Sequence, residues 1–370
     1  MQEKLNFIKN IFGFKGKSLK ISSKNKINFL EQFSNLINSG IPIINSLKII
    51  MYQTKDKKIK FMLEKIISDV NKGGNLRESF EKFPKIFGYF DLSIIEMGEV
   101  TGALGNSIET IKNKEEKDRE LKGKIIGALI YPIVIVSLST IMIGVFMVFV
   151  IPKIQKMYAD SKVNLPELTQ KVIQISDFTQ KNISYIILAI FIFILLFHIF
   201  KTNKFTKIYW DNFVLRIPLF GGLIKKKILA IFSSSLGILL KNGVMINKSL
   251  SISSKSLGND YYEKNLNDIN SRVSKGVQLS ELMGINDIQS GKENFLFPIE
   301  LASVVKIGEE TGNLPDLLIK ISKKQNKEID SVVKNIQTAI EPLVIVIIGI
   351  VVGTIIMAIM LPFFNMVNVV

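Results

Sequence analysis

Three long apolar runs constrain the fold of this chain more than any other feature of its sequence. The first, residues 125–151, has 27 positions without a charged side chain, which make roughly 40 Å of helix against a hydrocarbon core of about 30 Å. The second, residues 183–200, contains one histidine, His198, and the third, residues 343–364, is uncharged. Runs of this length are typical of transmembrane helices. The sequence therefore predicts an all-α integral membrane protein with three spans.

Lysines around the third run indicate how the spans are oriented. The residues after that run, 365–370, carry no charge, whereas five lysines precede it: Lys320, Lys323, Lys324, Lys327 and Lys334. Because positive residues concentrate on the cytoplasmic side, the N-terminus is expected in the cytoplasm and the C-terminus outside it. Lys153, Lys156 and Lys181, at the ends of the expected extracytoplasmic loop, weaken the charge bias around the first two spans. The predicted location is the cytoplasmic (inner) membrane, with several crossings.

A short phrase, Gly-Glu-x-Thr-Gly-x-Leu, occurs twice, at residues 98–104 and 308–314. Each copy is followed, at the same distance from its first glycine, by a proline near the start of an apolar run, in Tyr131-Pro132 and Glu341-Pro342. Self-similarity at a fixed spacing indicates an internal duplication. We therefore expect two homologous helical domains, each leading into a span, with residues 183–200 returning the chain to the cytoplasm between them.

The duplication extends beyond this phrase. The first copy opens with an amphipathic helix from Phe29 that ends at Gly40 and is followed by Pro42, and Gly243 lies at the position of Gly40 in the second copy. From Gly98 and Gly308 onward the offset between the copies is larger, so the second copy holds additional residues in the stretch 283–298. That stretch is rich in glycine and asparagine, which predicts a loop.

The repeated phrase supplies the main candidate functional positions. We expect its first glycine, Gly98 or Gly308, at a helix C-terminus, and its threonine as the cap of the following helix. The glutamates would then lie where the chain reverses between two helices. They either fix this turn by accepting hydrogen bonds from backbone or lysine, or contact a partner protein directly. The other candidates in the two copies are Glu99, Thr101, Gly102, Glu309, Thr311 and Gly312.

Prolines bracket the first and third spans. Each span has one proline near its start and another near its end, with the same spacing in both: Pro132 and Pro152, then Pro342 and Pro362. Such prolines permit a kink near the start of a span. Glu341, at the edge of the third span, either reaches the membrane interface or pairs with a neighbouring helix or subunit. His198 is expected to be neutral and hydrogen-bonded, with a proton relay as the alternative.

The charge balance points to a membrane surface rather than to nucleic acid. The net charge is +16, but the lysines are scattered among 32 carboxylates instead of forming a basic stripe with stacking aromatics. Anionic lipid headgroups are the partner expected for this excess. The chain has no cysteine and one histidine, so it offers neither a Cys/His nor a Ser/His/Asp site in its aqueous parts, and no zinc site. We expect no catalytic residue, cofactor or metal.

Three stretches together resemble the type II secretion system F family. They are Phe-x-x-Gln-Phe-x-x-Leu-Ile-x-Ser-Gly-Ile-Pro at residues 29–42, the repeated Gly-Glu-x-Thr-Gly-x-Leu, and residues 124–132 running on to Pro152. The resemblance covers residues 29–362, twice over. In the second copy Met245 stands at the position of Pro42. Only a short, lysine-rich segment precedes Phe29, so within this family the chain looks closer to the compact, competence-type or minimal pilus platforms than to longer members.

This resemblance implies two antiparallel six-helix bundles in the cytoplasm and three transmembrane helices. It also implies a non-catalytic platform that connects a cytoplasmic assembly ATPase to the pilins or pseudopilins of a type IV pilus, a competence pseudopilus or a type II secretion machine. Other inner-membrane assembly components belong to the same expectation. A homo-oligomer is expected because one three-span copy offers little surface to seat a filament.

The alternative function is a small oligomeric membrane transporter or channel. Spans without charged residues provide no polar path unless several subunits assemble. A membrane-tethered signalling module would need a sensor in the loop 153–182, which is too short for a folded domain.

The predicted segments are a basic N-terminal segment (1–27), the first bundle (28–124), span 1 (125–151), an extracytoplasmic loop (152–182), span 2 (183–200), the second bundle (201–338), span 3 (339–364) and an extracytoplasmic tail (365–370).

Overall fold

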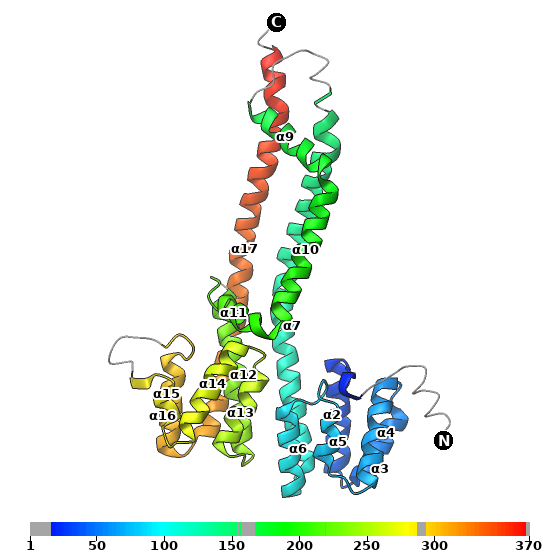
Figure 1. Cartoon of the computed structure of the whole chain (residues 1–370), viewed down its shortest axis with the longest axis vertical. Coiled ribbons are helices and arrows are strands. Elements are labelled where there is room, and N and C mark those ends of the chain that lie inside the picture. Colours follow the sequence, from blue (N-terminus) through cyan, green and yellow to red (C-terminus); the bar gives the residue numbers. More distant parts are fainter. Residues whose placement is uncertain (1–15, 154, 157–166, 219, 287–293, 368–370) are drawn as a thin grey trace. The chain divides into compact units, whose positions relative to one another are not determined.

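The computed structural model describes residues 16–153, 155–156, 167–218, 220–286 and 294–367, and the regular structure in these ranges is entirely helical (Figure 1). The prediction of an all-α protein is confirmed. The chain divides into two compact units. Unit 1 comprises the described residues up to Lys122 together with Val214–Ile329, and unit 2 comprises Gly123–Phe213 together with the described residues from Asp330 onward.

Unit 1 contains both copies of the repeat. After a short 3₁₀ turn (Gly16–Ser18), the first repeat consists of α2 (Ser23–Asn38), α3 (Ile43–Gln53), α4 (Lys57–Asn71), α5 (Leu76–Glu81), α6 (Tyr89–Thr101) and the start of α7 (Leu104–Val145). The second consists of α12 (Phe220–Lys241), α13 (Ile246–Ser256), α14 (Asp260–Val273), α15 (Leu279–Leu282), α16 (Ile299–Thr311) and the start of α17 (Leu314–Val367). Consecutive helices pack on one another from α2 to α6 in the first repeat and from α12 to α16 in the second.

Each repeat is built around a buried aromatic pair. The rings of Phe29 on α2 and Phe87, before α6, have centroids 6.3 Å apart, and their counterparts Phe232 and Phe297 are also 6.3 Å apart. All four side chains are almost fully buried, and burying a side chain of this size stabilises a fold by about 1.5–3 kcal/mol. The equivalent aromatic pairs give both repeats the same core contact.

The turns that separate the first helices also match. Gly40 follows α2 with φ +81°, and Gly243 follows α12 with φ +80°. This left-handed conformation is accessible to glycine at little cost, so the prediction that Gly40 ends the first helix of the repeat is confirmed. Pro42 and Met245 then occupy the same position, as the residues directly before α3 and α13. Proline is therefore dispensable at this turn.

Unit 2 consists of the remainder of α7 and α17, a π-helical turn (Phe146–Val150), α9 (Glu167–Lys181), α10 (Ile183–Thr202) and most of α11 (Lys204–Val214). Among the described residues, Ile133–Lys153 is long and apolar enough to cross a membrane. Two shorter apolar helical stretches, Ile183–Phe193 and Val344–Ala358, coincide with the other two predicted spans. Neither α9, in the predicted loop 152–182, nor the π turn was expected from the sequence.

The predicted borders between bundle and span, at residues 124 and 338, lie inside continuous helices. α7 extends from Leu104 to Val145 and α17 from Leu314 to Val367. A helix continues wherever its backbone hydrogen bonds are satisfied, so the change from polar to apolar residues alone does not end it. In the predicted loop 283–298, residues 287–293 lie outside the described part of the chain.

Candidate functional site

The glutamate of the repeated phrase caps the preceding short helix. Glu99, in the last turn of α6, accepts hydrogen bonds from Leu76 N (2.6 Å to Oε1) and Arg77 N (3.3 Å to Oε2). These are the first two amides of α5, and the amides of a first helical turn have no partner within the helix. The carboxylate also faces the positive end of the helix dipole. Glu99 therefore joins α6 to α5.

Glu309 makes the same contact in the second repeat. Its Oε1 accepts from Leu279 N at 2.7 Å and its Oε2 from Ser280 N at 3.2 Å, at the start of α15. Leu279 corresponds to Leu76 at the smaller offset between the copies, whereas Glu309 corresponds to Glu99 at the larger one. The contact therefore bridges the insertion in the second copy and is kept in both. It corresponds to the first alternative for these glutamates, in which they accept backbone hydrogen bonds.

The first glycine of the phrase permits close packing, and the prediction that it ends a helix is wrong. Gly98 and Gly308 are buried inside α6 and α16. A Cβ atom on Gly98 would lie 2.4 Å from Ser107 Oγ and 3.1 Å from Leu104 Cα, and one on Gly308 would lie 2.7 Å from Leu314 Cα. Any side chain here would collide with the next helix. The absence of a Cβ is what allows each helical hairpin to close.

The second glycine ends the helix instead. Gly102 and Gly312 have φ +71° and +69°, and α7 and α17 begin two residues later. The prediction that the threonine caps the following helix is also wrong, because Thr101 and Thr311 still belong to α6 and α16. Their hydroxyls donate at 2.7 Å to the carbonyls of Met97 and Ile307, four residues earlier.

The phrase-bearing helix of the first repeat also contacts the second repeat. α6 packs on α12 and α13. Glu96, three residues before Glu99, accepts from Lys248 Nζ on α13 at 3.1 Å and lies 3.4 Å from Arg77 Nε on α5. Lys255 Nζ lies 4.7 Å from the centre of the Tyr89 ring. Nothing in the local sequence singles out Glu96, because its lysine partner belongs to the other repeat.

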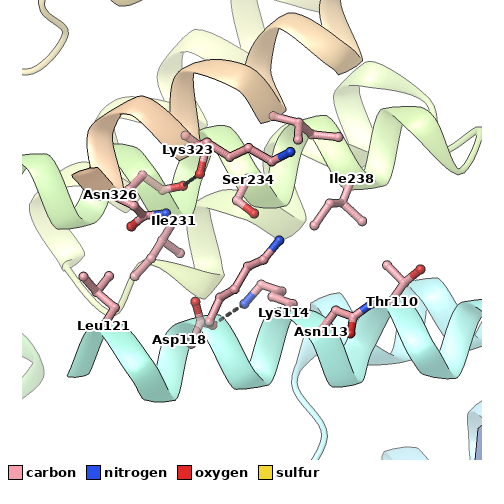
Figure 2. Close-up of a pocket in the computed structure, with 14 residues that line it drawn as sticks. Thr110, Asn113, Lys114, Asp118, Leu121, Ile231, Ser234, Ile238, Lys323 and Asn326 are labelled. Carbon is pink, nitrogen blue, oxygen red and sulfur yellow. Dashed lines mark hydrogen bonds and ion pairs between the residues drawn. The ribbon is translucent and has the colours of Figure 1, made fainter. Parts of the chain in front are cut away.

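A cleft of about 230 Å³ lies among α7, α12 and α17 within unit 1. Figure 2 shows Lys114 and Asp118 on α7, joined by an ion pair of 2.6 Å, with Ser234 of α12 and Lys323 of α17 above them. The other lining residues include Lys117, Asn113 and Asn326. Lysines outnumber carboxylates here, and the lining residues hold no nucleophile paired with a base. Among the described residues, no cluster of three or more His, Cys, Asp or Glu side chains is placed to hold a metal ion.

The first repeat buries an ionic cluster that sequence reasoning missed. Lys26 Nζ lies 2.7 Å from Asp91 Oδ2 and 2.9 Å from Glu115 Oε2. Burial lowers the pKa of Lys26, but the two carboxylates more than offset this and hold its pKa above the ordinary value. Burial raises the pKa of Glu115, but the charge of Lys26 and hydrogen bonds from Lys26 and Ser23 outweigh it, so its pKa lies below the ordinary value. The sequence feature that could have indicated this cluster is the position of Lys26 on the apolar face of an amphipathic helix.

The candidate positions in the apolar helices are placed as follows. Tyr131 on α7 and Pro342 on α17 are exposed, and Pro152 directly follows Ile151 at the end of the π turn. The backbone at Pro132, Glu341 and Pro362 is helical, and their side chains, like that of His198, lie outside the described part of the structure. Each copy of the phrase brings its own residues together within one hairpin.

Comparison with known proteins finds the same duplication, because one family model matches the chain in two regions. The family model for "Type II secretion system (T2SS), protein F" matches residues 29–152 and 232–362. The two matched regions begin at the equivalent residues Phe29 and Phe232 and end at the equivalent prolines Pro152 and Pro362, so each region is one repeat with the apolar helix that follows it.

Individual relatives match almost the whole chain. The type IV pilus assembly protein PilC of Pseudomonas aeruginosa is 28% identical over 343 residues, which cover 92% of this chain and 90% of that protein. PilC of Thermus thermophilus is 29% identical over 341 residues, covering 92% and 82%. The type II secretion system protein F of Pseudomonas aeruginosa is 25% identical over 335 residues, covering 90% and 81%.

Proposed function

The chain belongs to the type II secretion system protein F family, and from this premise we propose that it is a non-catalytic platform protein of an inner-membrane machine that assembles pili or pseudopili. The observation that carries the proposal is the match of both repeats, each with its span, to one family model. Relatives named as type IV pilus assembly proteins and as type II secretion system protein F match nearly all of the chain.

The proposed topology has two cytoplasmic six-helix bundles and three transmembrane helices. The lysines that precede the third span support the cytoplasmic location of the bundles, and the three apolar helical stretches in unit 2 support the number of spans. The segment borders predicted from the sequence remain the proposed domain boundaries, and the net positive charge would meet anionic lipid headgroups.

Coupling to a cytoplasmic assembly ATPase is proposed to proceed through α7 and α17. Each begins at the glycine turn of a repeat in unit 1 and continues into unit 2 without an interruption. Glu99 joins α6 to α5, and Glu309 joins α16 to α15. Because these contacts connect the helices of each bundle, a displacement of a bundle would be passed through α7 or α17 to its span. The proposed substrates of the machine are pilins or pseudopilins, and the platform is proposed to act as a homo-oligomer.

An insertion experiment tests this proposal. A Gly-Gly-Ser insertion after Ile329 would break α17 between the two units, and the same insertion between residues 286 and 294 serves as the matched control. In a strain lacking the native gene, we expect the control to restore filament assembly. The α17 insertion should bind the ATPase as the wild type does but should not restore assembly. If the deletion strain assembles filaments, the platform function is wrong; if the α17 insertion restores them, the coupling route is wrong.

A further inference from the structure

The proline at the end of the first apolar helix leaves a backbone carbonyl without its helical partner. In the π turn Phe146–Val150, the amide of Ile151 donates to Phe146 O, five residues earlier. In the same register the next residue, Pro152, would donate to Met147 O. Proline has no N–H, so the carbonyl of Met147 needs another donor.

The matching proline at the end of the third apolar helix has the same effect. Pro362 lies within α17, whose register is α-helical, so its missing N–H would have paired with Ala358 O. A carbonyl left unpaired in apolar surroundings is costly. Both copies of the repeat therefore end in a helix with one carbonyl that the helix cannot satisfy.

Helix α9 supplies donors to both carbonyls. Ser176 Oγ donates to Met147 O at 2.5 Å, supported by Gln180 Nε2 at 3.3 Å, and Thr169 Oγ1 donates to Ala358 O at 2.7 Å. Thr169 and Ser176 are both buried. They are two turns of α9 apart, so their side chains share one face of the helix.

The same face of α9 packs on both apolar helices between these hydrogen bonds. Val172 and Ile173 form one buried cluster with Ile151, Ile355 and Ala358. Within unit 2, α9 therefore lies against the π turn that follows α7 and against α17 (Figure 1). The hydrogen bonds at the two ends of this patch fix its position along both helices.

We infer that α9 is a crossbar whose hydroxyls at Thr169 and Ser176 replace the amide donors that Pro152 and Pro362 lack, and so hold the ends of the two repeat-derived spans together. Thr169 and Ser176 are positioning residues. This role goes beyond the proposed function, because it follows from the hydrogen bonds of unit 2 and not from the machine that the protein serves.

A double-mutant cycle on the full-length protein in detergent tests the donor replacement. Pro362→Ala restores an amide that can pair with Ala358 O. We expect Thr169→Val to lower the melting temperature by several degrees in the wild-type background and far less in the Pro362→Ala background, because the hydroxyl is then redundant. The same relation should hold for Ser176→Ala with Pro152→Ala. Equal losses in both backgrounds would overturn the inference.

The chain supplies a matched control and a conservative variant. Thr179 lies on the same helix but donates to Ile175 O of α9 itself, so Thr179→Val should leave the melting temperature nearly unchanged. Thr169→Ser keeps the hydroxyl and should behave as the wild type. If Thr169→Ser is as costly as Thr169→Val, or Thr179→Val is as costly as Thr169→Val, packing rather than the hydroxyl holds the helix, and the inference fails. This comparison remains decisive if the proline variants do not fold.

The crossbar itself can be tested by a distance measurement. The chain has no cysteine, so spin labels can be placed uniquely at Phe149→Cys and Ile356→Cys, both exposed positions near the two carbonyls. We expect a narrow distribution of distances between the labels, and a clear broadening when Thr169→Val and Ser176→Ala are combined. An unchanged distribution in that variant would show that α9 does not hold the helix ends together.

Discussion

Lys26 Nζ lies 2.7 Å from Asp91 Oδ2 in the first repeat, and the equivalent positions in the second repeat are Leu229 and Leu301. Glu115, the other partner of Lys26, corresponds to Gln325. Asp91 also accepts from Gly88 N at 3.2 Å, and the residue equivalent to Gly88 is Pro298, which has no N–H to satisfy. Equivalent core positions thus hold an ionic cluster in the first repeat and an apolar pair in the second.

Breaking the cluster should cost more than exchanging it. Lys26→Leu alone leaves the buried carboxylate of Asp91 and the half-buried carboxylate of Glu115 without their cation, and we expect it to reduce the free energy of unfolding by about 3–5 kcal/mol. The four changes Lys26→Leu, Asp91→Leu, Glu115→Gln and Gly88→Pro together copy the second repeat and should recover most of this loss. Denaturant unfolding of the full chain in detergent provides the comparison. A combined variant no more stable than Lys26→Leu would contradict the equivalence.

The cluster also makes stability depend on pH at both extremes. Because the pKa of Glu115 is lower in the folded protein than its ordinary value of 4.5, its contribution is complete above that value and is lost as the pH falls through the folded pKa. Because the pKa of Lys26 is raised above 10.5, its contribution is complete below that value and is lost as the pH rises through the folded pKa. Melting temperatures of the wild type should fall at both ends, and those of the four-residue variant should fall less steeply.

The capping glutamates should differ in importance. In the first repeat, Asn75 also caps α5 by accepting from Glu78 N, whereas Gln278 makes no such side-chain bond at α15. We expect Glu309→Ala to destabilise α15 by about 1–2 kcal/mol, and Glu99→Ala to destabilise α5 by less because Asn75 still caps it. Amide hydrogen exchange measures this difference. Relative to the wild type, exchange should rise more at Leu279 and Ser280 in the Glu309→Ala variant than at Leu76 and Arg77 in the Glu99→Ala variant. Glu310→Ala, at the exposed neighbouring residue, should leave both helices unchanged.

Local patterns in the sequence predicted the first helix of each repeat and the glycine turn after it, but not α9 and not the contacts between helices. The apolar spacing from Phe29 and the glycines at Gly40 and Gly243 act through neighbouring residues, so one sequence is sufficient to interpret them. The structural role of Gly98 depends on Ser107 and Leu104, which face it across a hairpin. The role of Pro152 depends on Ser176, which belongs to another helix. A glycine that ends a helix and a glycine that admits a neighbouring helix look the same in sequence. The duplication does carry one further signal, because aligning Lys26 with Leu229 marks a position where the two copies differ.

The glycines of the two hairpins should tolerate alanine unequally. On Gly98, the shortest contacts of a new Cβ are with the Ser107 side chain, 2.4 Å from Oγ and 2.6 Å from Cβ, whereas on Gly308 the shortest is with the backbone, 2.7 Å from Leu314 Cα. Overpacking of this kind typically costs about 1–3 kcal/mol.

We expect Ser107→Gly to restore much of the stability lost in Gly98→Ala, since it removes the side chain that the new methyl group meets. No substitution at Leu314 can remove its Cα, so Gly308→Ala should remain destabilised when combined with Leu314→Ala. Gly123→Ala, on the exposed surface of α7 with open space around it, should be neutral or slightly stabilising because alanine favours helix. Melting temperatures of these variants test the distinction, and equal rescue at both hairpins would show that side-chain contact, not backbone approach, limits each one.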